Sequence, residues 1–196
     1  MAKKRRMGPE NAATRIMLMD AVEAVMRGEG YAALSARKVA AHAGLKYQIV
    51  FYYFSTMDDL LLATYRRRIE RVLEKIRRAL QAQRPLHAFW EAWRDPADAA
   101  LSMEYMALAN HNETIRAETI AFGERIRRVK LGSLSDQLRR SGLDPHVFTP
   151  FAIAMALESV GGILGFEDAL GISGGHREIE RIVKWCLERL EPDGAV

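Results

Sequence analysis

Several side chains that can form hydrogen bonds follow Gly44 within a few residues, at Lys46, Tyr47, Gln48 and Tyr52. A lysine ammonium group can bind a phosphate or a guanine edge, and a glutamine amide can bind adenine through two hydrogen bonds. Tyrosine hydroxyls can bind phosphate oxygens. Together, these residue types are suited to contacts with double-stranded DNA.

The apolar residues between these side chains have helical spacing. Ile49, Val50 and Phe54 can face a small core while the polar side chains point outward. An earlier short segment begins at Ser35, a good helix N-cap, and ends before Gly44. Two short helices joined by a tight glycine turn form a helix-turn-helix, whose second helix lies in the major groove. Short helices with small apolar residues also occur in purely structural bundles, so the pattern alone leaves both interpretations open.

The charge distribution favours nucleic-acid binding. The chain has 196 residues and a formal net charge of +4. Nine Lys and Arg residues but only four acids lie at or before Met57, so the N-terminal third holds the excess positive charge. Such a segment can bind a polyanion, and a solvated basic tail is the alternative explanation.

The segment from Gly30 to Leu60 resembles the DNA-binding domain of TetR-type repressors, and the resemblance extends over about residues 14–65. The matching positions are Ser35, Val39-Ala40, Ala43-Gly44-Leu45, Tyr52-Tyr53-Phe54, Asp58 and Leu60. The resemblance implies phosphate contacts from Ser35, Arg37, Tyr52 or Tyr53, and Thr56. It also implies that the residues nearest to the bases are Lys46, Tyr47 and Gln48.

Three residues depart from the family pattern. Phe51 stands where a phosphate-binding tyrosine is usual, and Met57 replaces the usual lysine. Each of these two changes removes a phosphate contact. Gln48 replaces the common glycine and adds a side chain that could read a base. The basic run at residues 3–6 could compensate for the lost contacts as a flexible arm.

The rest of the chain also has helical spacing, with no convincing alternating strand. The sequence predicts an all-α fold, with an N-terminal three-helix helix-turn-helix domain joined by a linker helix to a larger helical ligand-binding and dimerisation domain. The predicted boundaries are a basic flexible tail at 1–13, the DNA-binding domain at 14–57 and the helical body at 58–196. Later helices are predicted to begin near Asp58, Leu86, Pro96, Asn112, Pro150 and Arg177.

Aromatic and methionine side chains recur on the helices that follow residue 85. Such residues are usually plain core, but the resemblance implies a ligand cavity there. The predicted apolar lining is Trp90, Trp93, Met103, Met106, Phe122 and Met155, and the polar candidates are Asn110, His111 and Glu158. Because pockets of this kind are mostly apolar and methionine adapts its shape, a small hydrophobic ligand is expected. A polar turn with a helix cap explains Asn110 to Asn112 equally well.

A homodimer on a partly palindromic operator is the expected assembly, because one small helix-turn-helix has little contact area. Helices near 150–170 and 177–190 are expected to pair with their symmetry mates. The predicted interface residues are Ala154, Leu157, Gly161, Ile182 and Trp185. Trp185 lies off the apolar stripe of the last helix, and an exposed tryptophan often marks a partner surface.

Other kinds of site have little support in the sequence. The five histidines have no ligand spacing, and Cys186 is the only cysteine, so neither a metal site nor an internal disulfide is predicted. No cofactor is predicted. No arrangement of nucleophile and base suggests an enzyme.

The expected location is the cytoplasm. The apolar stretch at 150–166 is shorter than the roughly 20 residues that span a bilayer. The basic start is not followed by the apolar core of a signal peptide. The favoured function is a repressor that its ligand releases from DNA. The alternatives are a regulator without a ligand, an activator, and a helical module that binds an acidic protein or RNA.

Overall fold

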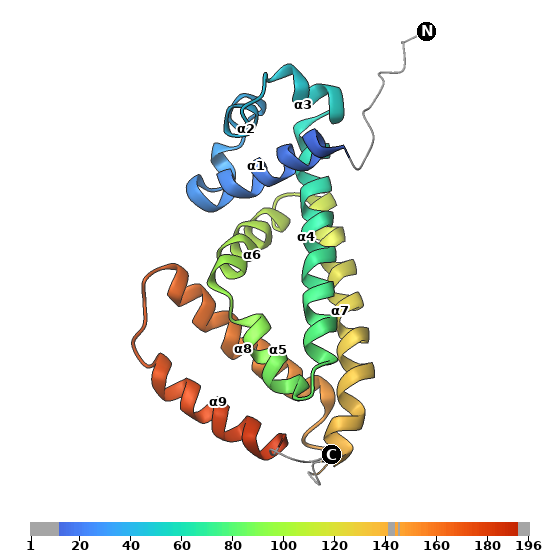
Figure 1. Cartoon of the computed structure of the whole chain (residues 1–196), viewed down its shortest axis with the longest axis vertical. Helices are drawn as coiled ribbons and strands as arrows, with labels where there is room; N and C mark the ends of the chain where they lie inside the picture. Colours follow the sequence, from blue (N-terminus) through green and yellow to red (C-terminus); the bar gives the residue numbers. More distant parts are fainter. Residues whose placement is uncertain (1–11, 141–143, 145, 192–196) are drawn as a thin grey trace. The chain divides into compact units, whose positions relative to one another are not determined.

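The computed structural model describes residues 12–140, 144 and 146–191, and every regular element in this part of the chain is helical (Figure 1). This confirms the predicted all-α fold. The helices are α1 Ala13–Glu29, α2 Ala36–His42, α3 Gln48–Tyr53, α4 Met57–Leu80, α5 Pro85–Trp93, α6 Pro96–Ala109, α7 Glu113–Arg140, α8 Pro150–Ala169 and α9 His176–Leu190, with a short 3-10 helix, η1, at Tyr31–Ala33. The candidate arm at 3–6 and the predicted end of α7 at 141–142 lie outside the described residues.

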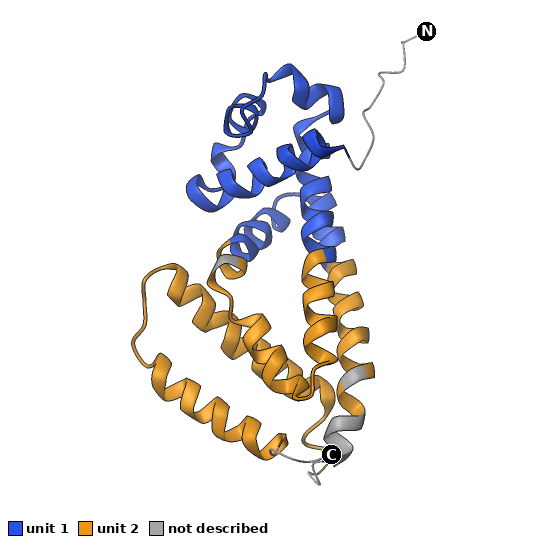
Figure 2. Cartoon of the chain, in the orientation of Figure 1, with its two compact units in different colours: residues 1–70, 101–119 blue, residues 71–100, 120–196 orange. Residues whose placement is uncertain are grey.

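Contacts between residues divide the chain into two compact units (Figure 2). Unit 1 contains residues 1–70 and 101–119, and unit 2 contains residues 71–100 and 120–196. Unit 1 therefore joins the three N-terminal helices to the first part of α4, the end of α6 and the start of α7. The boundary predicted between residues 57 and 58 divides the chain by role rather than by contact and stays a prediction.

The small core of unit 1 is built from one face of each N-terminal helix. The apolar positions of α1 recur every three or four residues, so they form one stripe that packs on α2. The fully buried side chains are Leu18 and Val22 from α1, Val39 from α2, Val50 from α3 and Leu60 from α4. These contacts fix α3 beside α2 and leave the other face of α3 for solvent.

Polar contacts connect α4 to the other helices of unit 1. The Arg67 guanidinium donates to Asp20 on α1 at 2.6 Å, and Arg68 donates to Ser102 on α6 at 2.8 Å. The Arg66 Nε donates to Glu118 on α7 at 2.7 Å. These three arginines of α4 therefore hold together the helices of this unit.

In unit 2, α5 packs on α8 through glycine and tryptophan. A Cβ atom added to Gly161 would lie 3.4 Å from Cζ3 of Trp90 and 3.5 Å from Cδ1 of Trp93. Trp93 also stacks on Phe89, with ring centroids 5.9 Å apart. The absence of a side chain at Gly161 thus lets the two indole rings lie against the backbone of α8.

The N-terminus of α5 is capped by the carboxylate of Glu191. Its oxygens accept the backbone N–H groups of Leu86 at 2.7 Å and His87 at 3.1 Å. The first N–H groups of a helix have no partner inside the helix, so a carboxylate there is stabilising. Glu191 is 3% exposed, and these bonds supply the partners that its buried charge requires.

The apolar helix α8 has 20 residues, so it is long and apolar enough to cross a membrane by length and composition. The prediction that this stretch is too short was wrong, because the helix continues to Ala169. Glu158, near its middle, forms an ion pair with Lys130 of α7. Gly161 packs against two indole rings. One such helix with these partners is weak evidence for a membrane span.

Candidate nucleic-acid interface

The helix α2 begins at an exposed serine cap. Ser35 has an extended backbone, and its Oγ accepts the backbone N–H of Lys38 at 3.2 Å. Since a hydroxyl both accepts and donates, the Ser35 hydrogen can still be given to a phosphate. Arg37, also predicted to contact phosphate, is exposed in the first turn of the same helix.

The turn between α2 and α3 depends on glycine at position 44. Gly44 has φ +69°, a backbone conformation that residues with a Cβ rarely adopt. The Leu45 N–H donates to the Ala40 carbonyl at 2.8 Å, and the Gly44 N–H donates to the Ala41 carbonyl at 3.1 Å. This pair of bonds is the Schellman motif, which ends a helix and redirects the chain. The turn therefore sets the angle at which α3 follows α2.

The second helix presents the predicted polar face to solvent. Lys46 and Gln48 are exposed, and the exposed fractions of Tyr47 and Tyr52 are 44% and 50%. On the other face Val50 and Phe54 are buried, as predicted.

The helix α3 begins at Gln48, and its N-cap is Tyr47. Lys46 and Tyr47 consequently lie in the turn and at the N-cap rather than inside the helix. N-terminal residues of a recognition helix are the ones that reach base edges.

Aromatic contacts fix part of this face. The Arg37 guanidinium lies 5.8 Å from the Tyr47 ring centroid, which connects a predicted phosphate contact on α2 to a predicted base contact at the N-cap of α3. The rings of Tyr52 and Tyr53 meet edge to face with centroids 4.9 Å apart. These contacts restrict the rotamers of the tyrosines before any DNA is bound.

The helix α4 begins with a reciprocal cap at Thr56. The Asp59 N–H donates to Thr56 Oγ1 at 3.0 Å, and the Thr56 N–H donates to Asp59 Oδ2 at 3.1 Å. Thr56 is exposed and lies immediately before α4. The predicted phosphate contact is thus held at a rigid helix end.

The cations of this surface differ in their availability. Lys38 forms an ion pair with Glu29, so part of its charge is neutralised inside unit 1. Within the described residues Lys46 has no ion-pair partner, which leaves its charge available for a phosphate or a base. An exposed cation, an amide and phenols at the start of the second short helix and along it, with hydroxyls at two neighbouring caps, define a helix-turn-helix DNA-binding protein.

The sequence of this domain is similar to that of a known family. Residues 18–64 match the family model described as bacterial regulatory proteins, tetR family. The match covers the N-terminal helix-turn-helix segment and supports a DNA-binding transcriptional regulator of the TetR family. No curated protein matches the chain in sequence.

Solved structures share the fold along most of the chain. A proposed transcriptional regulator from Pseudomonas aeruginosa PAO1 has a TM-score of 0.70 at 22% identity, with 96% of this chain and 94% of that chain covered. For the fatty acid degradation regulator FadR from Bacillus halodurans the TM-score is 0.67 at 16% identity, with coverages of 95% and 99%. For a TetR transcription regulator from Haloarcula marismortui ATCC 43049 the TM-score is 0.58 at 21% identity, with coverages of 91% and 90%.

The structure distributes the predicted ligand-binding residues over both units. Trp90 is buried and Trp93 and Phe122 are half-buried in unit 2. The three methionines, Met103, Met106 and Met155, are 41%, 61% and 44% exposed, which does not fit the lining of an enclosed apolar cavity. Asn110 and His111 are exposed in the turn between α6 and α7 of unit 1.

Glu158 has the partner that its burial requires. Its Oε1 accepts a hydrogen bond from Lys130 Nζ at 2.5 Å, and the two side chains are 16% and 6% exposed. Burial raises the pKa of Glu158, while the hydrogen bond and charge of Lys130 oppose that rise. A predicted ligand contact is therefore already engaged by a neighbouring helix.

The predicted dimer residues on α8 differ in burial from those on α9. Ala154, Leu157 and Gly161 are buried within the chain, so these three assignments need correction. A residue that is covered in its own protomer has no surface to offer a second copy. Ile182 and Trp185 are 59% and 54% exposed, which keeps them available.

Two residues with tertiary roles were not singled out from the sequence. Glu104 of α6 accepts the backbone N–H of Tyr31 at 2.7 Å, although the residues are 73 positions apart. Gly30 before Tyr31, with φ +78°, marks the turn but does not reveal the partner. Among the described residues, no three His, Cys, Asp or Glu side chains are grouped in a way that could hold a metal ion.

Proposed function

We propose that the protein is a cytoplasmic, homodimeric repressor that binds a partly palindromic operator and is released from it by a small hydrophobic ligand. The observation that carries the DNA-reading part is the exposed face of α3, where Gln48 lies at the helix start between Tyr47 and the buried Val50. An electrophoretic shift assay with the DNA upstream of the protein's own gene tests operator binding directly.

The Gln48→Ala variant is expected to lose base discrimination and keep most of its non-specific affinity. A bidentate amide–adenine contact contributes roughly 1–3 kcal/mol of discrimination at one base pair. The variant's affinities for the operator, for single-base operator variants and for random DNA measure this change. Equal loss on operator and random DNA would remove Gln48 from base readout.

Lys46→Ala, compared with Gln48→Ala, tests the electrostatic contribution to DNA affinity. If the ammonium group contacts phosphate, its loss weakens binding on all sequences and lowers the salt-dependence slope by about one. If the same change affects only one base pair and leaves the slope intact, Lys46 reads a base instead. Both residues are exposed, so neither substitution should disturb folding.

We place the dimer interface on the exposed faces of α8 and α9. On α8 the exposed positions Ala152, Met155, Ala156, Ser159 and Ile163 recur with helical spacing. On α9, Ile179 and Ile182 are exposed while Val183 and Leu187 pack inward. Small and apolar residues on an exposed helix face allow close contact with a second copy of the same face.

We place the hydrophobic ligand in unit 2, beside Trp90, Trp93 and Phe122. What supports this is the packing of two indole rings on the side-chain-free surface of α8. A Cβ atom at Gly162 would lie 3.7 Å from Nε1 of Trp93, an ordinary van der Waals distance, so Gly162 and this indole N–H border the proposed site. The ligand dissociates the complex only if it prefers a conformation with lower DNA affinity.

A thermal-shift panel of aromatic and acyl compounds tests the ligand proposal. A compound that raises the melting temperature is expected to lower operator affinity in the shift assay, and Gly162→Leu is expected to abolish both effects. Val183, on α9, provides the control, since Val183→Leu changes size away from Gly162. If no compound in the panel shifts the melting temperature, the alternative of a regulator without a ligand is favoured.

A further inference from the structure

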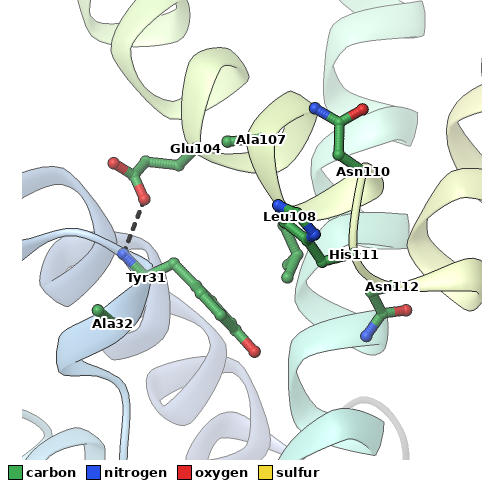
Figure 3. A pocket seen from close by; sticks show the side chains of 8 residues that line it. All are labelled: Tyr31, Ala32, Glu104, Ala107, Leu108, Asn110, His111 and Asn112. Carbon is green, nitrogen blue, oxygen red and sulfur yellow. Dashed lines mark hydrogen bonds between the residues drawn. The ribbon is translucent and has the colours of Figure 1, made fainter.

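A pocket lies inside unit 1, between η1 and the end of α6 (Figure 3). It has a volume of about 420 Å³, within the usual range for sites that bind small molecules. Its lining residues are Tyr31, Ala32, Glu104, Ala107, Leu108, Asn110, His111 and Asn112. None of the aromatic residues predicted to line the ligand cavity contributes to it.

Glu104 is the only acidic residue in the lining, and the lining has no lysine or arginine. One of its carboxylate oxygens, Oε2, accepts the Tyr31 N–H at 2.7 Å, as the dashed line in Figure 3 shows. A carboxylate has about four acceptor positions on its two oxygens, so this bond leaves capacity for a second donor. The site therefore has negative charge and room to accept a hydrogen bond.

The nearest arginine of the turn is already engaged. Arg116 donates from Nε to the Ala109 carbonyl at 2.9 Å and from a terminal nitrogen to the Asn110 carbonyl at 2.8 Å. These bonds hold the guanidinium at the C-terminal end of α6, where a cation is favourable. Arg116 thus stabilises the turn and is not among the residues that line the pocket.

The other walls offer a ring and uncharged hydrogen-bonding groups. The Tyr31 ring lies on the η1 side and His111 on the α6–α7 side (Figure 3). Asn112 Oδ1 accepts the Ile115 N–H at 3.0 Å, which leaves its amide N–H groups as donors. Tyrosine faces attract cations, particularly beside a carboxylate.

We propose that this pocket is a second small-molecule site, which binds a compact organic cation with a flat ring. The ammonium group binds Glu104, the ring lies along Tyr31, and polar substituents meet the carboxamides of Asn110 and Asn112. An anionic ligand is disfavoured by the Glu104 charge, and a purely apolar ligand would form no hydrogen bond with the polar side chains of the lining. The site is thus selective for positive charge.

Three probes that share a phenol and differ in charge test the site: tyramine, the neutral alcohol tyrosol, and the anion 4-hydroxyphenylacetate. Calorimetric titration of the full chain without DNA is expected to give a tyramine Kd at least ten-fold lower than that of either analogue. Because no DNA is present, the result is independent of whether the protein represses or responds to a ligand in unit 2.

Two variants assign the binding to this pocket. Glu104→Gln keeps an oxygen for the Tyr31 N–H and is expected to weaken tyramine binding at least ten-fold without changing tyrosol binding. Ala107→Trp, at an exposed position, is expected to fill the pocket and weaken both probes. Glu188→Gln, on α9 outside the pocket, controls for the general loss of a negative charge. The proposal is overturned if tyramine does not saturate, if the three probes bind equally, or if tyramine binding is unchanged in both variants.

Discussion

Replacing Lys130 with methionine is expected to lower the free energy of unfolding by about 3–5 kcal/mol. The substitution leaves the Glu158 carboxylate in a largely buried position without the ammonium group that lies 2.5 Å from it. An isolated buried charge loses its hydration and gains nothing in return. Urea denaturation followed by circular dichroism measures the loss.

The double variant Lys130→Met with Glu158→Leu separates charge from packing. Because both charges are removed and both replacements are apolar and of similar size, most of the lost stability should return. If the double variant is as unstable as Lys130→Met, the side-chain volume at Lys130 rather than the unpaired carboxylate explains the loss.

The pH dependence of stability follows from the direction in which the pKa of Glu158 is shifted. Burial raises the pKa of Glu158 above its unfolded value of 4.5, and the opposing effect of Lys130 is lost in the variant. A carboxyl group whose pKa is higher in the folded state stabilises that state at pH values below the pKa of the unfolded chain. This contribution is lost as the pH rises through the pKa of the folded state. The stability difference between the wild type and Lys130→Met should therefore shrink as the pH is lowered from about 8 to about 5.

The Ile182→Glu substitution is expected to dissociate the dimer and to reduce operator affinity by roughly 10²–10⁴-fold, the gain that linking two binding modules provides. Ile182 is 59% exposed in the protomer, so the charge is tolerated in a monomer but not in an apolar contact with a second copy. Light scattering at low protein concentration gives the oligomeric state, and the shift assay gives the affinity.

Lys184→Glu is the matched control on the same helix. The Lys184 side chain is 75% exposed and its Nζ lies 3.9 Å from Glu188, so the substitution changes charge without placing it on the apolar face. This variant should remain dimeric and bind the operator. A dimeric Ile182→Glu protein with full affinity would move the interface to another surface.

Helix ends were predicted well because their signals are local. Ser35 caps the helix that follows it, and helices begin at Pro96 and Pro150, as expected. A cap needs only the side chain and an N–H group two or three residues further on. The exposed face of α3 was also predictable, since its polar and apolar residues separate with the helical period.

The faces of α8 could not be predicted in this way. Ala154 and Leu157 are buried, whereas Met155 and Ile163 are exposed, yet all four are apolar or small. When a helix is apolar all round, its period does not show which side packs in the protomer and which faces a partner. The contact between Glu104 and Tyr31 was out of reach for a related reason, because it depends on how α6 packs beside the end of α1.

The exposed face of α3 has a consequence for redesign. Of its six residues only Val50 is fully buried, so the exposed groups that we propose to meet DNA contribute little to the folding of the domain. Operator preference can therefore be changed by substitution at Lys46 and Gln48 with little loss of thermal stability. Libraries at these two positions should yield many soluble variants, whereas Tyr47 is better retained because Arg37 lies over its ring.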